Sequence, residues 1–428
     1  MKGLILSAVI LLPSLPPGLN PLFLNQEGHT AVVEMLYVSP LRLGSRGEVK
    51  NYAARLVSLQ GQRAVLEVLE GFTWEGGEPL SAGDIAFTYN FLAHYRKNPT
   101  HPYWKGIKAY ARGKRVVIFF PSPPEKYHFL TPVLPERILR RSPPEELKRL
   151  PFSGPYRVVK TSPAKIVLER RKSFPLKTSF QKIVLLEVPD PVTRRMMMEA
   201  GQGDVCLCSR GNLPGRGFKI YKISRPAFLY LGFRGLSPSQ RCWVAERLRG
   251  VDFSSLSSGF ARPITSPFQV WFPFPDIRLE CKGKIPTRHL TLMVPAMRER
   301  LLLAQLIQSA LAPLRVRVLS LERGIFIKRL RAGNFSLALS GFSLDFPSDL
   351  KEVLGCGGAV NYFGYCSREM DRALSKGDWK RGHEIFLRDL PFLPLYVSLY
   401  PIAVRRGLGW APFETSFSSA SPFRSIVQ

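Results

Sequence analysis

The chain has 428 residues, enough for about three domain-sized units, and its 45% hydrophobic and 22% charged residues are typical of a globular protein. This composition excludes a disordered chain, a collagen and a coiled coil. The 61 Lys and Arg residues outnumber the 32 Asp and Glu residues, so the formal net charge is +29, and nucleic acid or an anionic membrane surface must be considered as a partner.

The N-terminus combines a positive start, Met1-Lys2-Gly3, with the nine-residue apolar run Leu4–Leu12. The run has the length of the apolar part of a secretory signal peptide and is too short to span a membrane. No small-residue cleavage pattern follows it, because the chain continues into a Pro-rich stretch. Residues 1–18 are therefore expected to be a signal segment, the favoured alternative, or a buried first strand.

The clearest local signal in the first half is Ser81, followed three residues later by Asp84, which predicts a capping box at the start of a helix that runs to about His94. Two further helices and six strands follow from apolar periodicity. The helices are His29–Tyr37 and Val192–Ala200, and the strands are Arg63–Leu69, Arg115–Phe120, Tyr156–Lys160, Ile166–Arg170, Lys182–Val188 and Val205–Cys208. The alternation of strands and helices indicates an α/β sheet.

The second half alternates in the same way, between two apolar segments. The apolar segments are Phe228–Phe233 and Leu395–Val404, and the elements between them are Leu290–Val294 (strand), Arg298–Leu311 (helix), Arg315–Leu319 (strand), Ile325–Arg331 (helix) and Phe335–Leu339 (strand). This pattern predicts a second α/β domain. The last two dozen residues are too few for a domain, so we expect them to return to the first one.

A series of short motifs, in a fixed order, covers about residues 19–425. They are Leu19–Leu22, Phe72–Phe87, Leu134-Pro135, Ser153–Tyr156, Ile166–Arg170, Met198–Val205, Tyr230–Phe233, Gly333–Pro347 and Asn361–Cys366. With them the chain resembles the extracellular solute-binding proteins (family 5) of peptide-type and nickel-type ABC transporters, which include the dipeptide- and oligopeptide-binding proteins. Phe342 stands where the family has Trp, and Pro347-Ser348-Asp349 replaces Pro-Asp-Pro; these departures concern the substrate more than the fold.

The resemblance implies an α/β, two-lobed periplasmic-binding-protein-like fold (type II, cluster C), whose lobes are joined by two crossing segments. Lobe I would comprise residues 19–228 and 400–428, with an inserted subdomain at about 40–148, and lobe II would comprise residues 229–399. The crossings would lie near Arg225–Phe233 and Leu395–Val404.

The resemblance also implies a function in binding and not in catalysis. A monomeric receptor would capture short peptides between its lobes, close by a hinge motion and deliver them to a membrane permease that works with an ATPase. The expected location is periplasmic or extracytoplasmic, with anchoring by an uncleaved N-terminal segment and contact with the membrane surface as further options. No enzyme motif such as GxSxG, a Walker loop or HExxH is present.

Six residues are candidates for the ligand site. The resemblance places Asp345 where an acidic residue pairs with the α-amino group of a peptide; its alternative role is that of a turn residue before Phe346-Pro347. Asn361, Tyr362 and Phe363 are candidates for lining the site. Phe342 could equally be a core residue, since aromatic side chains are buried mostly for packing. Arg262 is a candidate for a ligand carboxylate, although a solvated basic residue is the commoner role.

The chain has six cysteines, none in a CxxC pair, and six scattered histidines, so we expect neither a metal nor a cofactor. Cys356 and Cys366 are ten residues apart across a Gly-rich bend and would form a disulfide in an oxidising compartment; two free buried thiols are the alternative. Cys206 and Cys208 lie two residues apart in an expected strand, at a Cα separation of roughly 6.5–7 Å, and are expected to be free.

Two alternatives remain beside a peptide receptor. A nickel, haem or other solute receptor would use the same fold, but the isolated histidines make a metal receptor less favoured than a peptide receptor. A nucleic-acid-binding protein would account for the charge of +29, yet the basic residues are spread along the chain and no helix-turn-helix, RNP or zinc motif accompanies them. We therefore expect no nucleic-acid partner.

Overall fold

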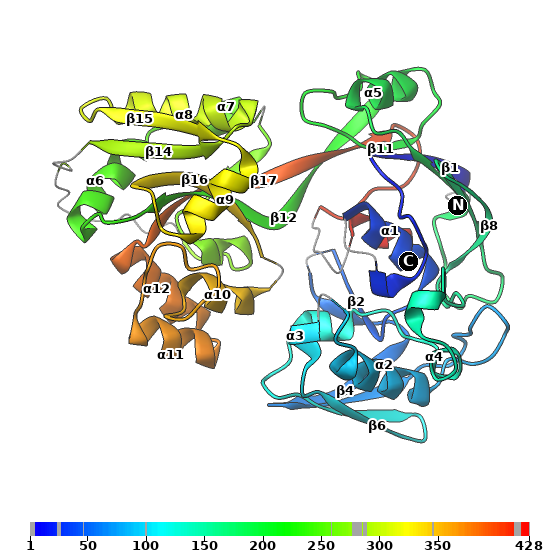
Figure 1. Cartoon of the computed structure of the whole chain (residues 1–428). Helices are drawn as coiled ribbons and strands as arrows, with labels where there is room; N and C mark the ends of the chain where they lie inside the picture. Colours follow the sequence, from blue (N-terminus) through cyan, green and yellow to red (C-terminus); the bar gives the residue numbers. More distant parts are fainter. Residues whose placement is uncertain are drawn as a thin grey trace. The chain divides into compact units, whose positions relative to one another are not determined.

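The computed structural model describes residues 5–23, 27–45, 47–98, 101–257, 259–275, 285, 289–344, 346–414 and 421–427. The chain forms two compact units, unit 1 with Met1–Ile223 and Tyr400–Gln428, and unit 2 with Ser224–Leu399 (Figure 1). The chain passes from one unit to the other twice, inside the long strands β12 (Phe218–Phe233) and β17 (Phe392–Arg405). Each unit combines a sheet with helices, so the expected α/β class is confirmed.

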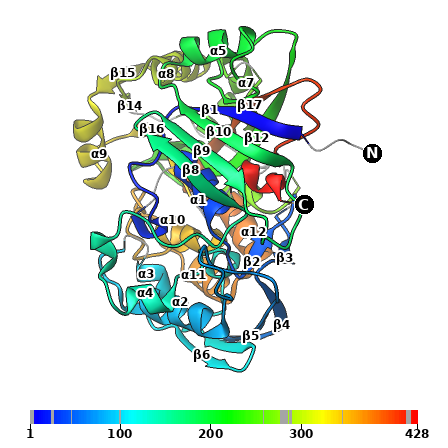
Figure 2. The ribbon, with the colours of Figure 1, turned by 90° about the vertical axis from the view of Figure 1, so that its right-hand side faces the viewer.

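Unit 1 is built around a mixed sheet with the strand order β11-β1-β10-β9-β8 (Figure 2). β1 pairs in parallel with β10 and β11, whereas β10, β9 and β8 are antiparallel to one another. Helix α5 packs on β11, and α1 packs on β8. These elements are β1 (Ile5–Leu12), β8 (Tyr156–Ser162), β9 (Lys165–Arg170), β10 (Phe180–Glu187), β11 (Val205–Leu207), α1 (Glu27–Leu36) and α5 (Pro191–Glu199).

The apolar N-terminal run forms β1, an interior strand of this sheet. Ala8, Ile10 and Leu11 are completely buried, and Ile10 pairs with Leu185 on one side and Val205 on the other. The structure thus places residues 5–12 of the N-terminal segment in a strand.

A second sheet of unit 1 has the order β4-β5-β7-β6 and is covered by helix α2, which packs on β6 and β7. The predicted capping box is confirmed at the start of α2. The Ser81 hydroxyl accepts from the amide of Asp84 (3.1 Å), and the Asp84 carboxylate accepts from the amide of Ser81 (2.9 Å). The elements are β4 (Ala54–Gln60), β5 (Arg63–Val68), β6 (Lys108–Arg112), β7 (Arg115–Phe119) and α2 (Ala82–His94).

The C-terminal turn η6 (Pro422–Ile426) is fastened to α1 by buried polar groups. The Glu34 carboxylate accepts a hydrogen bond from the amide of Ser421 (3.0 Å). The Arg424 side chain is buried and donates to the carbonyl oxygens of Ser421 (2.6 Å) and Leu43 (3.2 Å). Burial raises the pKa of Glu34 to about 7, although Arg424 opposes this rise.

Unit 2 contains a sheet with the order β15-β14-β16-β12-β17, in which β14 is parallel to β15 and β16. Helix α8 packs on one face of this sheet through Leu303 and Ile307, and α9 packs on the other through Phe326 and Leu330. The elements are β14 (Leu290–Pro295), β15 (Val316–Leu321), β16 (Leu337–Ser343), α6 (Pro238–Leu248), α8 (Arg298–Ala310), α9 (Arg323–Arg331), α10 (Leu350–Leu354), α11 (Arg368–Lys376) and α12 (Trp379–Asp389).

The remaining short elements are β2 (Leu41–Leu43), β3 (Val49–Asn51), β13 (Ala261–Pro263), α3 (His101–Trp104), α4 (Glu136–Leu139) and α7 (Phe253–Leu256). Within the described part of the chain, no helix is long and apolar enough to cross a membrane.

Two disulfides are present in the described chain. Cys356 is bonded to Cys366, with a Cα separation of 4.2 Å. Cys206 is bonded to Cys208, so the expectation that these two thiols are free was wrong. The reason is local, because β11 ends at Leu207 and Cys208 lies outside the regular strand. The Cα atoms of Cys206 and Cys208 are consequently 5.2 Å apart, within the usual range for a bridge.

Candidate functional site

Most of the predicted ligand-site residues lie in unit 2, at the end of β16 and in the loop between α10 and α11. Phe342 is the penultimate residue of β16, and Asn361, Tyr362 and Phe363 lie in the loop. Asp345, the predicted anchor for a peptide amino group, lies outside the described residues.

Three aromatic rings are stacked at this end of β16. The ring centroids of Tyr230 and Phe342 are 4.5 Å apart at an interplanar angle of 18°, and those of Phe342 and Tyr362 are 6.3 Å apart at 16°. Tyr230 and Phe342 are buried, whereas Tyr362 is only partly buried. Tyr362 is therefore the outer and most exposed ring of the stack, while burial favours a packing role for Phe342.

Phe363 also packs in the core. Its ring is 4.7 Å from that of Phe392 and meets Tyr230 edge-on at 5.3 Å. The ring lies against Gly232, where an added Cβ would come within 2.8 Å of it. Gly232 thus permits this close contact between β12 and the loop, and Phe363 holds the base of the loop in place.

Asn361 uses its side chain to shape the loop. The amide nitrogen donates to the carbonyl oxygens of Gly355 (2.8 Å) and Tyr365 (2.5 Å), and the amide oxygen accepts from the backbone of Tyr365 (3.2 Å). These bonds occupy both ends of the amide. They favour a structural role for Asn361, which sets the conformation of the residues on either side of Tyr362.

A disulfide and a polar chain fasten the same loop to α11 and α12. The Cys356–Cys366 bond closes it, and the Tyr365 hydroxyl donates to the Asp389 carboxylate (2.7 Å), which Arg388 also contacts (2.8 Å). Burial raises the pKa of Asp389, but the hydrogen bonds from Arg388 and Tyr365 outweigh it and keep the pKa below its usual value. Tyr362 is thus presented on a loop with several independent restraints.

Arg234 supports this loop, and the sequence analysis did not identify it. Its guanidinium donates to the carbonyl oxygen of Tyr362 (3.5 Å). It also lies against Gly364, which has a φ of 65° and where an added Cβ would meet the guanidinium at 2.1 Å. The available signal was position, because Arg234 directly follows the motif strand that ends at Phe233.

Arg262 lies elsewhere in unit 2, on the short strand β13. This strand pairs with β17, where Arg262 faces Val397. The Arg262 side chain is exposed, and its guanidinium donates to the carbonyl oxygen of Gln269 (3.2 Å). The structure therefore places Arg262 at an exposed position of a short strand and does not bring it to the aromatic stack.

Residues 64–233 match the family described as bacterial extracellular solute-binding proteins, family 5 Middle. The match runs from β5 through β12 and ends in the first residues of unit 2. The resemblance to this family is confirmed. No curated protein matches the chain at a significant level.

Solved structures extend the likeness to the whole chain. The ABC transporter substrate-binding protein CtaP of Listeria monocytogenes is similar with a TM-score of 0.82 and 16% identity over 99% of both chains. DppA of Helicobacter pylori, in complex with the peptide STSA, gives a TM-score of 0.70 and 16% identity over 100% of this chain and 98% of that one. NikZ of Campylobacter jejuni, in complex with Ni(L-His), gives a TM-score of 0.67 and 16% identity over 94% of both chains.

These structures establish that the chain has the fold of the family 5 solute-binding proteins. The predicted two-lobed α/β fold is thus confirmed. Within the described residues, no group of three or more His, Cys, Asp and Glu side chains is arranged to hold a metal ion.

Proposed function

We propose that this protein is the substrate-binding component of an ABC transporter and that its substrates are short peptides. The observation that carries the proposal is the structural likeness to CtaP over 99% of both chains, together with the family match over residues 64–233. The peptide bound to DppA supports the choice of ligand class. Binding and delivery require no bond to be made or broken, so the proposed role is not catalytic.

Recognition would use the peptide backbone and one charged end. An extended peptide has unpaired N–H and C=O groups that can be satisfied by backbone hydrogen bonding, which tolerates many side chains. We assign Asp345 to the peptide amino group, because an ammonium group removed from water needs a carboxylate partner. The partly exposed ring of Tyr362 would contact a ligand side chain, while Arg234 and Asn361 hold its loop in place.

Location and partners follow from this role. The family description is of extracellular proteins, which supports a site of action outside the cytoplasmic membrane. The disulfide between Cys356 and Cys366 suits an oxidising compartment. The partner would be a membrane permease with its ATPase, and the receptor would act as a monomer.

The proposal can be tested by thermal unfolding with a library of short peptides. A ligand at 100 times its Kd adds about 2.7 kcal/mol of stability, which is easily measured as a rise in Tm. Titration with nickel–histidine complexes and with haem serves as the comparison for the alternative receptors. Stabilisation by one of these and by no peptide would replace the peptide assignment.

Two variants then separate the roles of the candidate residues. Asp345→Asn keeps the shape and removes the charge, so peptides with a free amino end should bind on the order of 3–5 kcal/mol more weakly, whereas N-acetylated peptides should be unaffected. Tyr362→Ala should weaken binding, while Tyr110→Ala, at an exposed tyrosine of unit 1, is the matched control and should not. Unchanged affinity of Asp345→Asn for free-amine peptides would remove the anchor assignment.

A further inference from the structure

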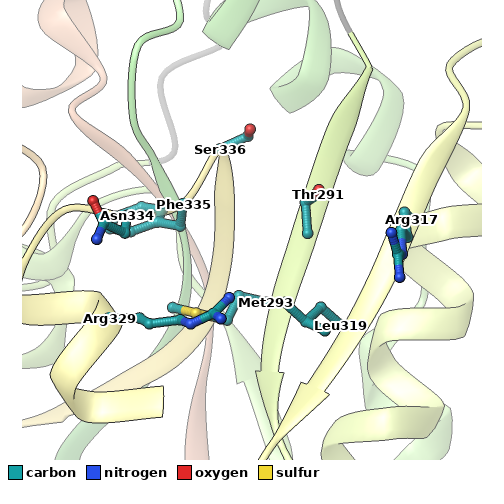
Figure 3. A pocket seen from close by; sticks show the side chains of 8 residues that line it. All are labelled: Thr291, Met293, Arg317, Leu319, Arg329, Asn334, Phe335 and Ser336. Atoms are coloured by element: carbon teal, nitrogen blue, oxygen red, sulfur yellow. The ribbon is translucent and has the colours of Figure 1, made fainter. Parts of the chain in front are cut away.

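A groove lies on the face of the unit 2 sheet that carries helix α9. Its volume is about 500 Å³, and it is lined by residues of β14, β15 and α9 and by the segment that leads into β16 (Figure 3). A groove of this size is within the usual range for small-molecule sites. It differs from the aromatic stack described above, whose residues come from β12, β16 and the loop between α10 and α11.

Two arginines flank this groove. Arg317 comes from β15 and Arg329 from α9, and Figure 3 shows Arg329 near Met293 and Arg317 beyond the strand that carries Thr291. In the described part of the chain, neither guanidinium has an ion pair with a carboxylate. The other polar lining residues are Thr291, Asn334 and Ser336, all of which can donate hydrogen bonds, and no acidic side chain lines the groove.

The surrounding charge has the same sign. Residues 290–343 contain eight Lys and Arg residues against two acidic ones, Glu299 and Glu322. Glu299 belongs to α8, which packs on the opposite face of the sheet. Glu322 caps α9, where its carboxylate accepts from the amides of Gly324 (2.7 Å) and Ile325 (3.2 Å). Neither carboxylate therefore neutralises the arginines of the groove.

The rest of the lining is apolar. Met293, Leu319 and Phe335 contribute their side chains, and Met293 is buried in the small core beneath α9. A ligand that matches this surface has an anionic group for the two arginines and a small apolar body for the remaining area. A guanidinium offers paired donors that suit the oxygens of a phosphate group, and hydroxyl and amide donors complete the set.

We propose that this groove is a second binding site, which takes a soluble phosphate ester with a small apolar body. The phosphate would lie between Arg317 and Arg329 and accept hydrogen bonds from Thr291 or Ser336. An inorganic phosphate ion is much smaller than the groove and would use only its charged part. The site would act independently of the peptide ligand, since it uses none of the same residues.

Phenyl phosphate is the probe, and isothermal titration calorimetry of the full chain at low ionic strength is the measurement. We expect saturable binding, weaker binding of inorganic phosphate and no binding of phenol. Arg317→Ala/Arg329→Ala should weaken the binding of phenyl phosphate by at least about tenfold, because it removes both charged hydrogen-bond donors from the site. Arg317→Lys/Arg329→Lys keeps the charge, so its affinity for phenyl phosphate should lie between the affinities of the original protein and of Arg317→Ala/Arg329→Ala.

Arg315→Ala/Arg331→Ala is the matched control. It removes the same charge from exposed positions beside the groove that do not line it, and it should bind phenyl phosphate nearly as well as the original protein. Equal losses of affinity for phenyl phosphate in the two double variants would mean that the ligand is held only by general electrostatic attraction, and the proposed site would be wrong. Circular dichroism and Tm confirm that each variant is folded.

Vesicles distinguish a soluble ligand from a phospholipid headgroup. Co-sedimentation with phosphatidylglycerol vesicles should be no weaker for Arg317→Ala/Arg329→Ala than for Arg315→Ala/Arg331→Ala. If phenyl phosphate does not bind, or if vesicle binding alone depends on Arg317 and Arg329, the proposal of a soluble phosphate ester is overturned. Peptide binding by the groove variants is expected to be unchanged, so the two proposed sites can fail separately.

Discussion

Arginines of unit 1 and arginines in the β15–α9 part of unit 2 have different surroundings. On the second sheet of unit 1, Glu67 pairs with Arg55 (2.6 Å) and Arg115 (3.2 Å). Elsewhere in unit 1, Arg424 is buried among carbonyl oxygens and attracted by Glu34. In unit 2, Arg317 and Arg329 border a groove and have no carboxylate partner among the described residues.

The difference shows why a net charge of +29 does not identify a partner. Basic residues in paired or buried positions serve the fold, and only those without partners are available to a ligand. The excess charge therefore has to be assigned position by position. The predictions below test this division, beginning with a buried arginine of unit 1 and ending with the arginines of the groove.

The largest effect is expected for Arg424→Ala. This substitution leaves the Ser421 and Leu43 carbonyl oxygens and the Glu34 carboxylate without their buried cationic partner, so the free energy of unfolding should fall by about 3–5 kcal/mol. Urea denaturation followed by circular dichroism measures this change. Arg63→Ala, at an exposed position of β5, is the control and should change stability by less than about 0.5 kcal/mol. Similar losses of stability for Arg424→Ala and Arg63→Ala would contradict the division between arginines that serve the fold and arginines that do not.

The next effect concerns pH and His128, which is buried between Tyr103 and Glu125. Burial lowers its pKa to about 4 from an ordinary value of 6.5. The unfolded chain therefore binds a proton more readily than the native one, and stability should fall by about 3 kcal/mol as the pH drops from 6.5 to 4. His128→Gln should lose this dependence, and His94→Gln, at an exposed histidine of α2, should keep it. Denaturation curves at a series of pH values provide the comparison.

Glu34 should act in the opposite direction. Its pKa is raised to about 7 from 4.5, so the native state holds the proton more tightly and stability should fall as the pH rises from 4.5 to 7, by up to about 3 kcal/mol. Glu34→Gln should remove this fall while keeping the shape of the contact with Ser421. The variant and the original protein should therefore differ more in stability at pH 7 than at pH 4.5. A constant difference across this range would exclude the shifted carboxyl.

Local patterns predicted much of the fold. The capping box at Ser81 formed as expected, because it depends on residues three positions apart. Strand β12 was harder to delimit. It begins at Phe218, but only its apolar end at Phe228–Phe233 was predicted, since the preceding residues mix charged and apolar side chains. The Cys206–Cys208 bond was missed because the strand was expected to extend through Cys208.

The candidate site could be predicted only in part. The motif around Asn361 located the loop, but the sequence could not distinguish the buried ring of Phe363 from the outer ring of Tyr362, since both residues are aromatic and adjacent. Arg234 is distant in sequence from the loop that it supports, and a single amino-acid sequence gives no sign of such a contact. The groove likewise depends on strands and a helix that meet only in the folded unit.

The smallest effect is expected in the groove itself and has the opposite sign. Arg317 and Arg329 lie in a region of like charge without a carboxylate partner among the described residues, so each contributes repulsion to the ligand-free protein. Arg317→Gln/Arg329→Gln should therefore raise the free energy of unfolding by a few tenths of a kcal/mol at low ionic strength, and added salt should abolish the gain. Arg55→Gln, which breaks the pair with Glu67, should give no such gain. If the groove variant instead loses stability at low salt, then Arg317 and Arg329 serve the fold as the unit 1 arginines do.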